Sequence, residues 1–494
     1  MASVQRLLPF LLTVLFQIPL FGSSAEPEPP GAKQLPVVPS EGASTPISSK
    51  SIDSLLLITV DTLRADALGI YGHPREPLPA VSRWADRGVT FDGAFATSSW
   101  TVPSLASLLT SLYPSSHGAI HGIRQEKVIR GQESIPEQAT TLAEALRQIG
   151  FTTFGVTSNP HLASQFGFQR GFQRYMNLNR AAASKVTERV FRWREDVETA
   201  PKAFLWLHFF DPHLPFTSTP GEIVELRPEL SESRVQEALI VLKELRQGLG
   251  VVTAREEPAA RFLQYRAEIE ALYEADIQLV NQQIEEILAA FPRFRDGVIC
   301  FTADHGEEFL EHGYLGHGFN LHAETLRVPL VLVHPNLSAG QRIDRAVSLV
   351  DLAPTLLTLV GGQPQKGWYG RTVFSSRGQW KGELSPVISE VSRFELKKPQ
   401  ASLQQGSLKL IATGSEPRRS KNPLATPTRL ELYDLKLDPG ERRDISRARP
   451  LETERLYRSL LERLAKAPNL AGKRERLVLS GETLKALKAL GYLQ

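Results

Sequence analysis

Acidic and histidine side chains follow three apolar stretches of this 494-residue chain, at the point where each stretch ends. Asp61 follows LLLITV, and Asp304 and His305 follow GVICFTA. Three more residues lie at or just after AFLWL: His208, Asp211 and His213. Carboxylate oxygens and imidazole nitrogens are ligands of divalent cations, and two acids and a histidine after two different strands can form a metal site. Taken singly, each has a structural explanation as a turn, cap or core residue.

A hydroxyl group in the stretch SSWTVPSLASLLTSLYP, residues 98–114, can also do chemistry. Thr101 lies two residues before Pro103, which suits a first helical turn. The leucines that follow have the spacing of one apolar helix face: Leu105, Leu108, Leu109 and Leu112. The stretch therefore predicts an amphipathic helix with Thr101 at or near its N-cap. The hydroxyl could simply cap the helix, which stabilises by about 1 kcal/mol. It could instead face a phosphate or sulfate at the helix N-terminus and, beside a divalent cation, act as a nucleophile.

Alternating strands and helices must position these groups. Short runs rich in β-branched or aromatic residues predict strands at 54–60, 151–157, 203–210, 297–303 and 328–334. Helical patterns lie between them, for example at 140–150 and 265–291. This alternation predicts an α/β domain with a mostly parallel sheet covered on both faces. Because ligands bind at the carboxyl ends of such strands, we expect the acids and histidines to meet in one cleft.

The pattern of polar and apolar residues changes after about residue 376. Polar and apolar residues alternate at 407–413 and 429–435, which predicts a small antiparallel sheet, and a charged helix follows from about 451 to 466. We therefore expect a catalytic domain over residues 51–375 and an α+β subdomain over residues 376–494.

The first 25 residues have the pattern of a cleavable secretory signal peptide. Arg6 precedes an apolar run that prolines interrupt, and small residues end the segment at Ala25. An uncleaved amphiphilic anchor is the alternative. Residues 26–50 are rich in Pro, Ser and Gly and predict a flexible leader. No later stretch has the uninterrupted apolar length of a membrane span, so we expect no stable span after signal cleavage.

Charge and cysteine content indicate which compartment and which class of partner the protein has. Cys300 is the one cysteine, so the chain cannot form an intramolecular disulfide. An exported protein without disulfides fits a bacterial periplasm or exterior better than a eukaryotic secretory lumen. The net charge of +3 comes from 57 basic and 54 acidic residues spread along the chain, which argues against a nucleic-acid partner.

Eight sequence blocks in order resemble the sulfatase-like branch of the alkaline phosphatase superfamily. They lie at residues 55–66, 98–118, 140–156, 208–216, 301–313, 316–332, 432–445 and 487–493. The resemblance therefore extends from Ser54 almost to the last residue. It implies a doubly wound α/β catalytic domain with a smaller C-terminal sheet and helix, a metal ion in the cleft and a covalent intermediate at the motif nucleophile.

The resemblance also implies roles for the polar residues of the predicted cleft. Asp61, Asp304 and His305 match the metal ligands of the family. Thr101 stands where the nucleophile stands, and it would bind the metal as well. The ion would be Ca, Mn or Zn, one per chain, or two if a second site recruits further side chains.

Further histidines and polar groups match positions that face the substrate. His213, in DPHLP, matches a histidine that faces the substrate, and His317, in GHG, matches a residue that contacts the transferred group or its leaving oxygen. Asn159, His208 and Asp211 are candidates for substrate binding. His208 and Asp211 could instead orient His213 or serve a second metal, and structural roles are open for both. Four residues lie near the site in sequence but are not expected as ligands: Glu307, Glu308, His312 and His322.

Departures from the sulfatase pattern turn the expectation from sulfate towards phosphate. Sulfatases read C-x-P-S-R or S-x-P-S-R where this chain reads TVPSL, and their Cys or Ser is oxidised to formylglycine. Thr101 cannot give that aldehyde because its β-carbon carries a methyl group, and Leu105 replaces the motif arginine. Thr62 follows Asp61 where sulfatases usually have a second acid. The K-W-H-L-G segment is absent, and Asn159 would substitute as a neutral donor. A threonine nucleophile is typical of superfamily members that act on phosphorus.

The sequence therefore predicts a metal-dependent phosphoric ester hydrolase, with phosphodiesters favoured, that works through a covalent threonine intermediate. Its substrate would be a small anionic ester or one derived from a glycan or lipid. Three alternatives stay open. One is a sulfatase that uses the threonine hydroxyl directly, and another is a phosphoglycerol- or phosphoethanolamine-type transferase. The third is an inactive homologue that binds anionic glycans.

Overall fold

A computed structural model describes most of the chain after its N-terminal segment. The described residues are 52–120, 134–247, 257–382, 386–392, 398–415 and 423–470, together with 481 and 485. The predicted signal peptide and leader, at 1–25 and 26–50, lie outside the described residues, as does the last sequence block at 487–493. Among the described residues, no helix is both long enough and apolar enough to cross a membrane.

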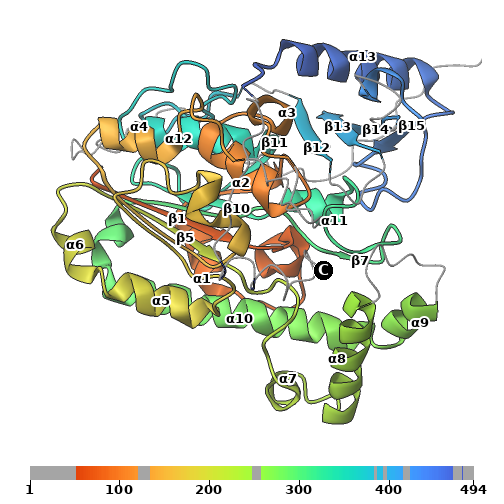
Figure 1. The fold of residues 1–494 in the computed structure, drawn as a ribbon, viewed down its shortest axis with the longest axis horizontal. Helices are drawn as coiled ribbons and strands as arrows, with labels where there is room; N and C mark the ends of the chain where they lie inside the picture. The colour runs from red at the N-terminus through yellow and green to blue at the C-terminus, as the bar shows by residue number, and fades with distance from the viewer. Residues whose placement is uncertain are drawn as a thin grey trace, which may run out of the picture. The chain divides into compact units, whose positions relative to one another are not determined.

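A mostly parallel sheet of nine strands runs through the described residues (Figure 1). Its strands are β1 Ser54–Val60, β2 Val89–Phe95, β3 Thr152–Thr157, β4 Arg174–Asn177, β5 Ala203–Phe209, β6 Val298–Ala303, β9 Arg327–Val328, β10 Leu330–Val333 and β11 Gln341–Ser348. Their order is β11-β2-β10-β6-β1-β5-β3-β4, with β9 beside β2. β10 and β9 run antiparallel to their neighbours, and the other neighbouring strands are parallel. The predicted mostly parallel α/β sheet is confirmed.

The central strands are buried along their whole length, which explains why the sequence pattern found them. Every residue of β1, β5 and β6 is buried, because each strand has a neighbour on both sides and helices cover both faces of the sheet. β2 and β11 lack a continuous run of buried apolar residues. Asp92 and Gly93 interrupt the first, and the second is a polar edge strand that begins QRIDR. Neither was predicted.

Helices cover both faces of the sheet (Figure 1). One face carries α1 Pro79–Arg87, α5 Ala183–Phe191 and α10 Arg266–Ala290, and the other carries α2 Thr101–Thr110, α4 Leu142–Gln148 and α12 Leu352–Leu359. The remaining helices of the described connections are α3 Pro114–His117, α6 Arg194–Thr199, α7 Pro220–Leu226, α8 Glu232–Gln247, α9 Glu257–Gln264 and α11 Ala323–Leu326. A helix layer on each face is the arrangement of a doubly wound fold.

Helix α2 is buried on all sides, so the prediction of an amphipathic helix with one apolar face was wrong. All ten of its residues are buried. The reason is that α2 packs against α4 and α12 as well as lying on the sheet, and its small residues Ser104, Ala106 and Ser107 leave room for these neighbours. Trp100 is the N-cap, and Thr101 is the first residue of the helix. The Thr101 hydroxyl is therefore not used as the cap.

A smaller antiparallel sheet follows, as the sequence predicted. Its strands are β12 Val387–Val391, β13 Gln400–Gln405, β14 Leu408–Thr413 and β15 Arg429–Asp434, in sequence order, and helix α13 Pro450–Lys466 packs on it. β12 lies beside the segment between β2 and α2. Ser389 Oγ donates to the Ala96 carbonyl at 2.6 Å, and Glu390 N donates to the Thr97 carbonyl at 2.8 Å. The domain boundary near residue 375 stays a prediction.

Candidate active site

The register of the central strands brings the predicted metal ligands together. In the parallel pairs, Val60 at the end of β1 lies opposite Ala303 at the end of β6 and opposite Phe209 at the end of β5. The next residues, Asp61 and Asp304, therefore emerge side by side at the carboxyl edge of the sheet, and both are fully buried. This is the edge where open α/β sheets bind their ligands.

The two carboxylates leave one oxygen each for a cation. Asp61 Oδ2 accepts a hydrogen bond from Asn159 Nδ2 at 2.5 Å, and Asp304 Oδ1 accepts one from His305 N at 2.9 Å. Asp61 Oδ1 and Asp304 Oδ2 are buried without a hydrogen-bond partner among the described residues. Buried polar atoms are nearly always paired, so two such oxygens beside each other fit a divalent cation.

The pKa shifts of the two acids agree with a shared cation site. Burial and the neighbouring Asp61 charge raise the pKa of Asp304 to about 6. Burial would also raise the pKa of Asp61, but the hydrogen bond with His208 and the nearby histidines hold it below its usual range. The arrangement concentrates negative charge where water cannot screen it, and a bound cation offsets this repulsion.

His305 presents a lone pair to the same point. Its Nδ1 lies 2.8 Å from the Gly306 carbonyl, so Nδ1 carries the proton and Nε2 is the acceptor in the neutral ring. Nε2 lies 3.4 Å from Asp304 Oδ2, 3.7 Å from Asp61 Oδ1 and 3.3 Å from Thr101 Oγ1. The structure thus brings the four residues predicted to hold the metal into one cluster.

Asn159 contacts Thr101 as well as Asp61. Its Oδ1 accepts a hydrogen bond from His161 N at 2.9 Å, which turns the amide nitrogen towards the cluster. Nδ2 then donates to Thr101 Oγ1 at 3.2 Å. The sequence suggested Asn159 as a donor to the substrate, and the structure places this donor on the hydroxyl of the predicted nucleophile.

His208 lies beside the predicted metal ligands Asp61 and Asp304. Its Nε2 is 3.3 Å from Asp61 Oδ2, and its Nδ1 is 2.9 Å from Thr59 Oγ1, which also accepts a hydrogen bond from Trp206 Nε1. Donor atoms of Asp61, His208 and Asp304 all lie within 4.8 Å of one another. The structure therefore adds His208 to the groups that could hold the cation.

His213 and His317 lie beside the cluster, next to each other. Their ring centroids are 4.9 Å apart, and the His317 ring is 4.5 Å from that of His305. His213 stacks on Phe210 at 4.4 Å, and burial lowers the pKa of His213 to about 4. His213 is therefore neutral at pH 7 in the protein without substrate.

Glu307 is a functional candidate that the sequence pattern did not indicate. Its Oε1 lies 2.9 Å from His317 Nδ1, and its side chain is 1% exposed. Burial raises the pKa of Glu307 to about 7. An acid two residues after a predicted metal ligand has no distinctive spacing to a histidine ten residues later, so only the folded loop shows the pair.

Asp211 is not brought into the cluster. Its Oδ2 accepts a hydrogen bond from Ala183 N at the start of α5, at 2.8 Å, and its Oδ1 accepts one from Thr217 Oγ1 at 3.3 Å. These contacts tie the loop after β5 to a helix N-terminus. The substrate-binding role of Asp211 stays a prediction.

Replacing Asp211 by asparagine should change the pH dependence of stability. Burial and the nearby Asp276 charge raise the pKa of Asp211 from its ordinary value of 3.8 to about 6. Between these values the folded state binds more protons than the unfolded state, so stability falls as pH rises from about 4 to 6. We expect Asp211→Asn to remove about 2 to 3 kcal/mol of this loss. Urea unfolding in the presence of a chelator, at pH 4 and at pH 7.5, measures the free energy of unfolding that each protein loses between the two pH values.

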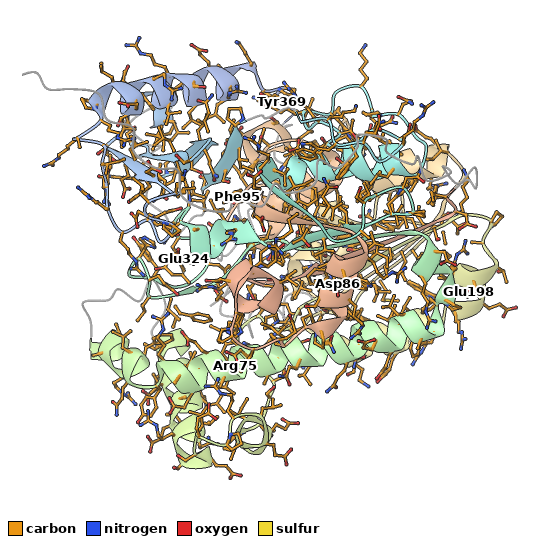
Figure 2. All side chains as sticks on the ribbon, turned by 180° about the vertical axis from the view of Figure 1, so that it is seen from behind. Arg75, Asp86, Phe95, Glu198, Glu324 and Tyr369 are labelled. Atoms are coloured by element: carbon orange, nitrogen blue, oxygen red, sulfur yellow. The ribbon has the colours of Figure 1, made fainter. Side chains whose placement is uncertain are left out.

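The matched control for this measurement is Asp86→Asn. Asp86 is exposed on α1 (Figure 2), and its replacement should leave the pH dependence unchanged. If Asp211→Asn and the wild type lose the same free energy of unfolding between the two pH values, the assignment to Asp211 is wrong.

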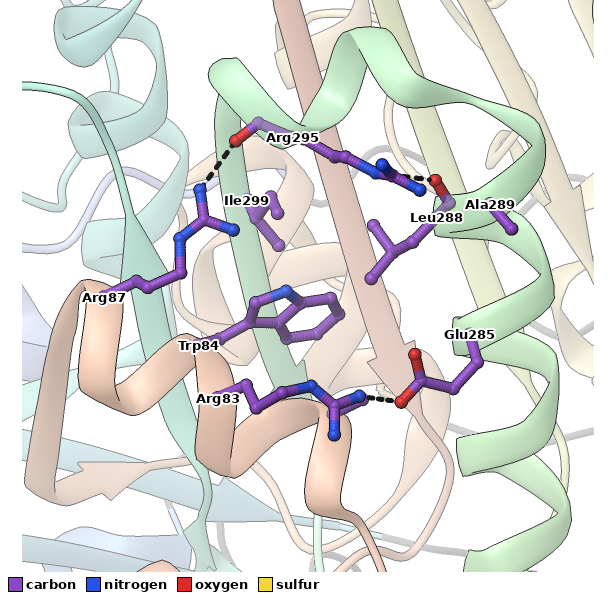
Figure 3. A pocket seen from close by; sticks show the side chains of 9 residues that line it. Arg83, Trp84, Arg87, Glu285, Leu288, Ala289, Arg295 and Ile299 are labelled. Atoms are coloured by element: carbon purple, nitrogen blue, oxygen red, sulfur yellow. Dashed lines mark hydrogen bonds and ion pairs between the residues drawn. The ribbon is translucent and has the colours of Figure 1, made fainter.

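A separate pocket of about 300 Å³ lies at the opposite edge of the sheet (Figure 3). Ile299, near the amino end of β6, lines it, whereas Asp304 follows the carboxyl end of the same strand. Arg83 pairs with Glu285 there, and Arg87 donates to the Arg295 carbonyl at 2.9 Å. The pocket lies between α1 and α10 and takes no part in the cluster.

Comparison with known proteins identifies the family. The family model for sulfatases matches residues 53–362. The chain is similar to the multifunctional alkaline phosphatase superfamily protein PehA of Trinickia caryophylli, with 26% identity over 469 residues that cover 78% of this chain and 90% of that protein. It is also similar to a Δ4,5-hexuronate-2-O-sulfatase of Bacteroides thetaiotaomicron, with 23% identity over 80% of this chain and 84% of that one.

A solved structure agrees with the sequence comparisons. The phosphonate monoester hydrolase of Agrobacterium radiobacter has the same fold, with a TM-score of 0.62, 19% identity, and coverage of 84% of this chain and 95% of that one. The resemblance predicted from the eight blocks is confirmed, as is the expectation of an ester hydrolase. The chain belongs to the sulfatase family of the alkaline phosphatase superfamily.

Proposed function

We propose that the protein is a metal-dependent phosphoric ester hydrolase, with phosphodiesters favoured, and that Thr101 is its nucleophile. The observation that supports this most directly is the position of the Thr101 hydroxyl. Thr101 Oγ1 lies 3.3 Å from His305 Nε2 and accepts the Asn159 amide hydrogen, beside the open oxygens of Asp61 and Asp304.

The cation would be held by Asp61, Asp304 and His305, with the Thr101 oxygen beside it. A divalent ion bound there supplies positive charge that favours ionised hydroxyls and offsets charge on a transferred group. The imidazole nitrogen of His305 accompanies the two carboxylates, and a donor set that includes nitrogen suits Mn or Zn better than Ca.

Each residue of the site has a separate role in the proposed reaction. Thr101 gives its hydroxyl proton to solvent water, and its oxygen attacks phosphorus while the leaving alcohol departs, so one P–O bond forms and one breaks. The Asn159 amide donates to the Thr101 oxygen as it loses its proton. The leaving oxygen takes a proton from a histidine, and water then hydrolyses the phospho-threonine ester.

His317 is better placed than His213 to supply that proton. Glu307 Oε1 lies 2.9 Å from His317 Nδ1, and this contact holds the His317 ring beside His305 and His213. His213 instead faces the Leu214 carbonyl with Nδ1 at 2.5 Å, and burial keeps it neutral near pH 7. We therefore assign proton donation to His317 and substrate contact to His213.

The environment of residue 105 supports chemistry without formylglycine. Leu105 stands at the position of the motif arginine and is 0% exposed within α2. An apolar side chain buried there cannot serve as the motif's cationic group. Together with the methyl group of Thr101, this favours a direct hydroxyl nucleophile.

The substrate would be a small anionic ester or one derived from a glycan or lipid, outside the cytoplasm of a bacterium. The relatives include a sulfatase and a phosphonate monoester hydrolase, so attack on either sulfur or phosphorus is compatible with this fold. Steady-state rates for an aryl phosphodiester, an aryl phosphate monoester and an aryl sulfate test the proposal. The phosphodiester should be fastest.

The same set of assays separates the alternatives. A clear preference for the aryl sulfate would establish a sulfatase that uses the threonine hydroxyl. Faster product formation with an added alcohol acceptor would indicate a transferase, and absence of turnover on every ester would indicate a binding protein.

Replacing His317 should harm reactions with poor leaving groups most. An alkoxide needs a proton to depart, whereas nitrophenolate leaves as a stable anion. We expect His317→Gln to lower kcat/KM by about 100-fold for an alkyl phosphodiester and far less for a nitrophenyl one. His213→Gln is the matched comparison, and its loss should not depend on the leaving group. The reverse pattern would exchange the two roles.

A further inference from the structure

A buried ionic cluster joins the C-terminal sheet to the loop that carries His317. Its members are Lys409 on β14, Glu441 after β15, and His312, His322 and Glu324 around the His317 loop. Lys409 and Glu441 are each 1% exposed. Burying this much charge is costly unless every group is paired. None of these residues belongs to the candidate active site described above.

Glu441 is the centre of this cluster. Its Oε1 lies 2.7 Å from Lys409 Nζ, its Oε2 lies 2.7 Å from His322 Nδ1, and its backbone carbonyl lies 3.0 Å from His312 Nε2. The two histidine rings stack in parallel with centroids 3.6 Å apart. Burial would raise the pKa of Glu441, but the Lys409 charge and the His322 hydrogen bond lower it to about 2. The carboxylate is therefore charged at every physiological pH.

The backbone of Glu441 is held in an unfavourable conformation. Its φ is 53°, in the left-handed region that favours glycine. The chain nevertheless has a glutamate here, directly after Gly440. Strain of this kind persists where the surrounding contacts require the side chain at that position.

The loop that includes His312 and His322 forms one hydrogen-bonded unit. Glu308 Oε1 accepts from the backbone nitrogens of His312 and Tyr314 at 2.7 and 2.8 Å, and Glu308 Oε2 accepts from Asn320 Nδ2 at 2.5 Å. The short strands β7 Glu308–Phe309 and β8 Leu315–Gly316 pair within it. His317 follows β8 directly, so its position depends on where this unit is held.

His322 connects that unit to the C-terminal sheet. Its backbone nitrogen donates to Asn320 Oδ1 at 3.2 Å, and its ring contacts Glu441. A second contact joins Arg442 to the carbonyl of Glu311 on the same loop. The loop is thus anchored at both ends by the segment after β15.

We propose that Glu441 is a positioning residue for His317: through His322 and His312 it fixes the loop that sets His317 against Glu307. The inference rests on the proposed role of His317 as the proton donor. A general acid must lie within hydrogen-bond reach of the leaving oxygen, and small displacements reduce its effect strongly.

The test measures how the cost of a substitution depends on the leaving group. We expect Glu441→Gln to lower kcat/KM about tenfold more for an alkyl phosphodiester than for a nitrophenyl one, with the metal content unchanged. His322→Gln breaks the same contact from the loop and leaves the Lys409–Glu441 pair intact. It should give the same pattern and keeps the test available if Glu441→Gln does not fold.

The matched control is Asp444→Asn. Asp444 lies three residues from Glu441 but accepts from Leu432 N at 3.1 Å and Ser446 N at 2.9 Å, within the C-terminal segment. Its replacement should reduce activity on the two diesters equally, if at all.

The outcomes separate this inference from the proposed function. If His317→Gln shows the leaving-group dependence and both Glu441→Gln and His322→Gln lose activity equally on the two diesters, or lose none, the positioning role is wrong. If His317→Gln itself shows no leaving-group dependence, the assignment of His317 as proton donor fails, and the role of Glu441 fails with it.

Discussion

We expect Thr101→Ala to lower kcat/KM for a phosphodiester by about 10⁴-fold or more, because the variant has no oxygen to attack phosphorus. The fold should survive. The Thr101 side chain does not cap α2, and the hydrogen bonds lost are those to Asn159 and His305, so the cost in stability is about 1 kcal/mol. Steady-state kinetics and thermal unfolding of the variant measure both effects.

Thr101→Ser is the control for this substitution. Serine keeps the hydroxyl and removes only the methyl group, so activity should stay within about tenfold of the wild type. If the alanine variant also stays within that range, Thr101 is not the nucleophile, and the hydroxyl at the start of α2 has a structural role.

We expect Asp304→Asn to abolish tight metal binding and to lower activity by about 10³-fold or more. The change removes one of the two carboxylates of the candidate active site that leave a buried oxygen open. At pH 7.5 it should also stabilise the metal-free protein by about 2 kcal/mol. Burial and Asp61 raise the pKa of Asp304 to about 6, so this carboxyl destabilises the folded state progressively as the pH rises from about 4 to 6, and the full loss is present at pH 7.5.

Two measurements check this prediction. Elemental analysis after dialysis gives the metal content, and thermal unfolding with chelator or added Mn or Zn gives the stability. Added metal should stabilise the wild type and the Asp86→Asn control but not Asp304→Asn. An Asp304→Asn protein that retains one tightly bound ion per chain would remove Asp304 from the set of ligands.

The central sheet could be predicted because its strands are buried on both faces. β1 and β5 are continuous apolar runs for that reason, and the polar residues after them stand out. β2 and β11 could not be found in the same way. One contains Asp92 and Gly93, and the other exposes polar side chains at the sheet edge.

The ligand cluster could be predicted only in part. Asp61, Asp304 and His305 directly follow strands, so their meeting at one edge follows from parallel pairing alone. The place of His208 depends on register, because Thr59 lies opposite it and turns it towards Asp61. The strand alone does not show which contacts a histidine near its end will make.

Contacts made by loops could not be predicted. Asp211 follows β5 as Asp61 follows β1, yet it contacts Ala183 and Thr217 instead of the cluster. The contact of Glu307 with His317 depends on how the loop after β6 folds back, and no spacing in the sequence encodes that path.

The most direct test of Thr101 as the nucleophile is to trap the enzyme during turnover. The protein is mixed with a phosphodiester, quenched in acid and digested, and the peptide that contains Thr101 is analysed by mass spectrometry. We expect a substrate-derived phosphoryl group on Thr101 in the wild type and none in Thr101→Ala. A modified residue other than Thr101, or turnover without any modified peptide under conditions that trap an intermediate, would contradict it.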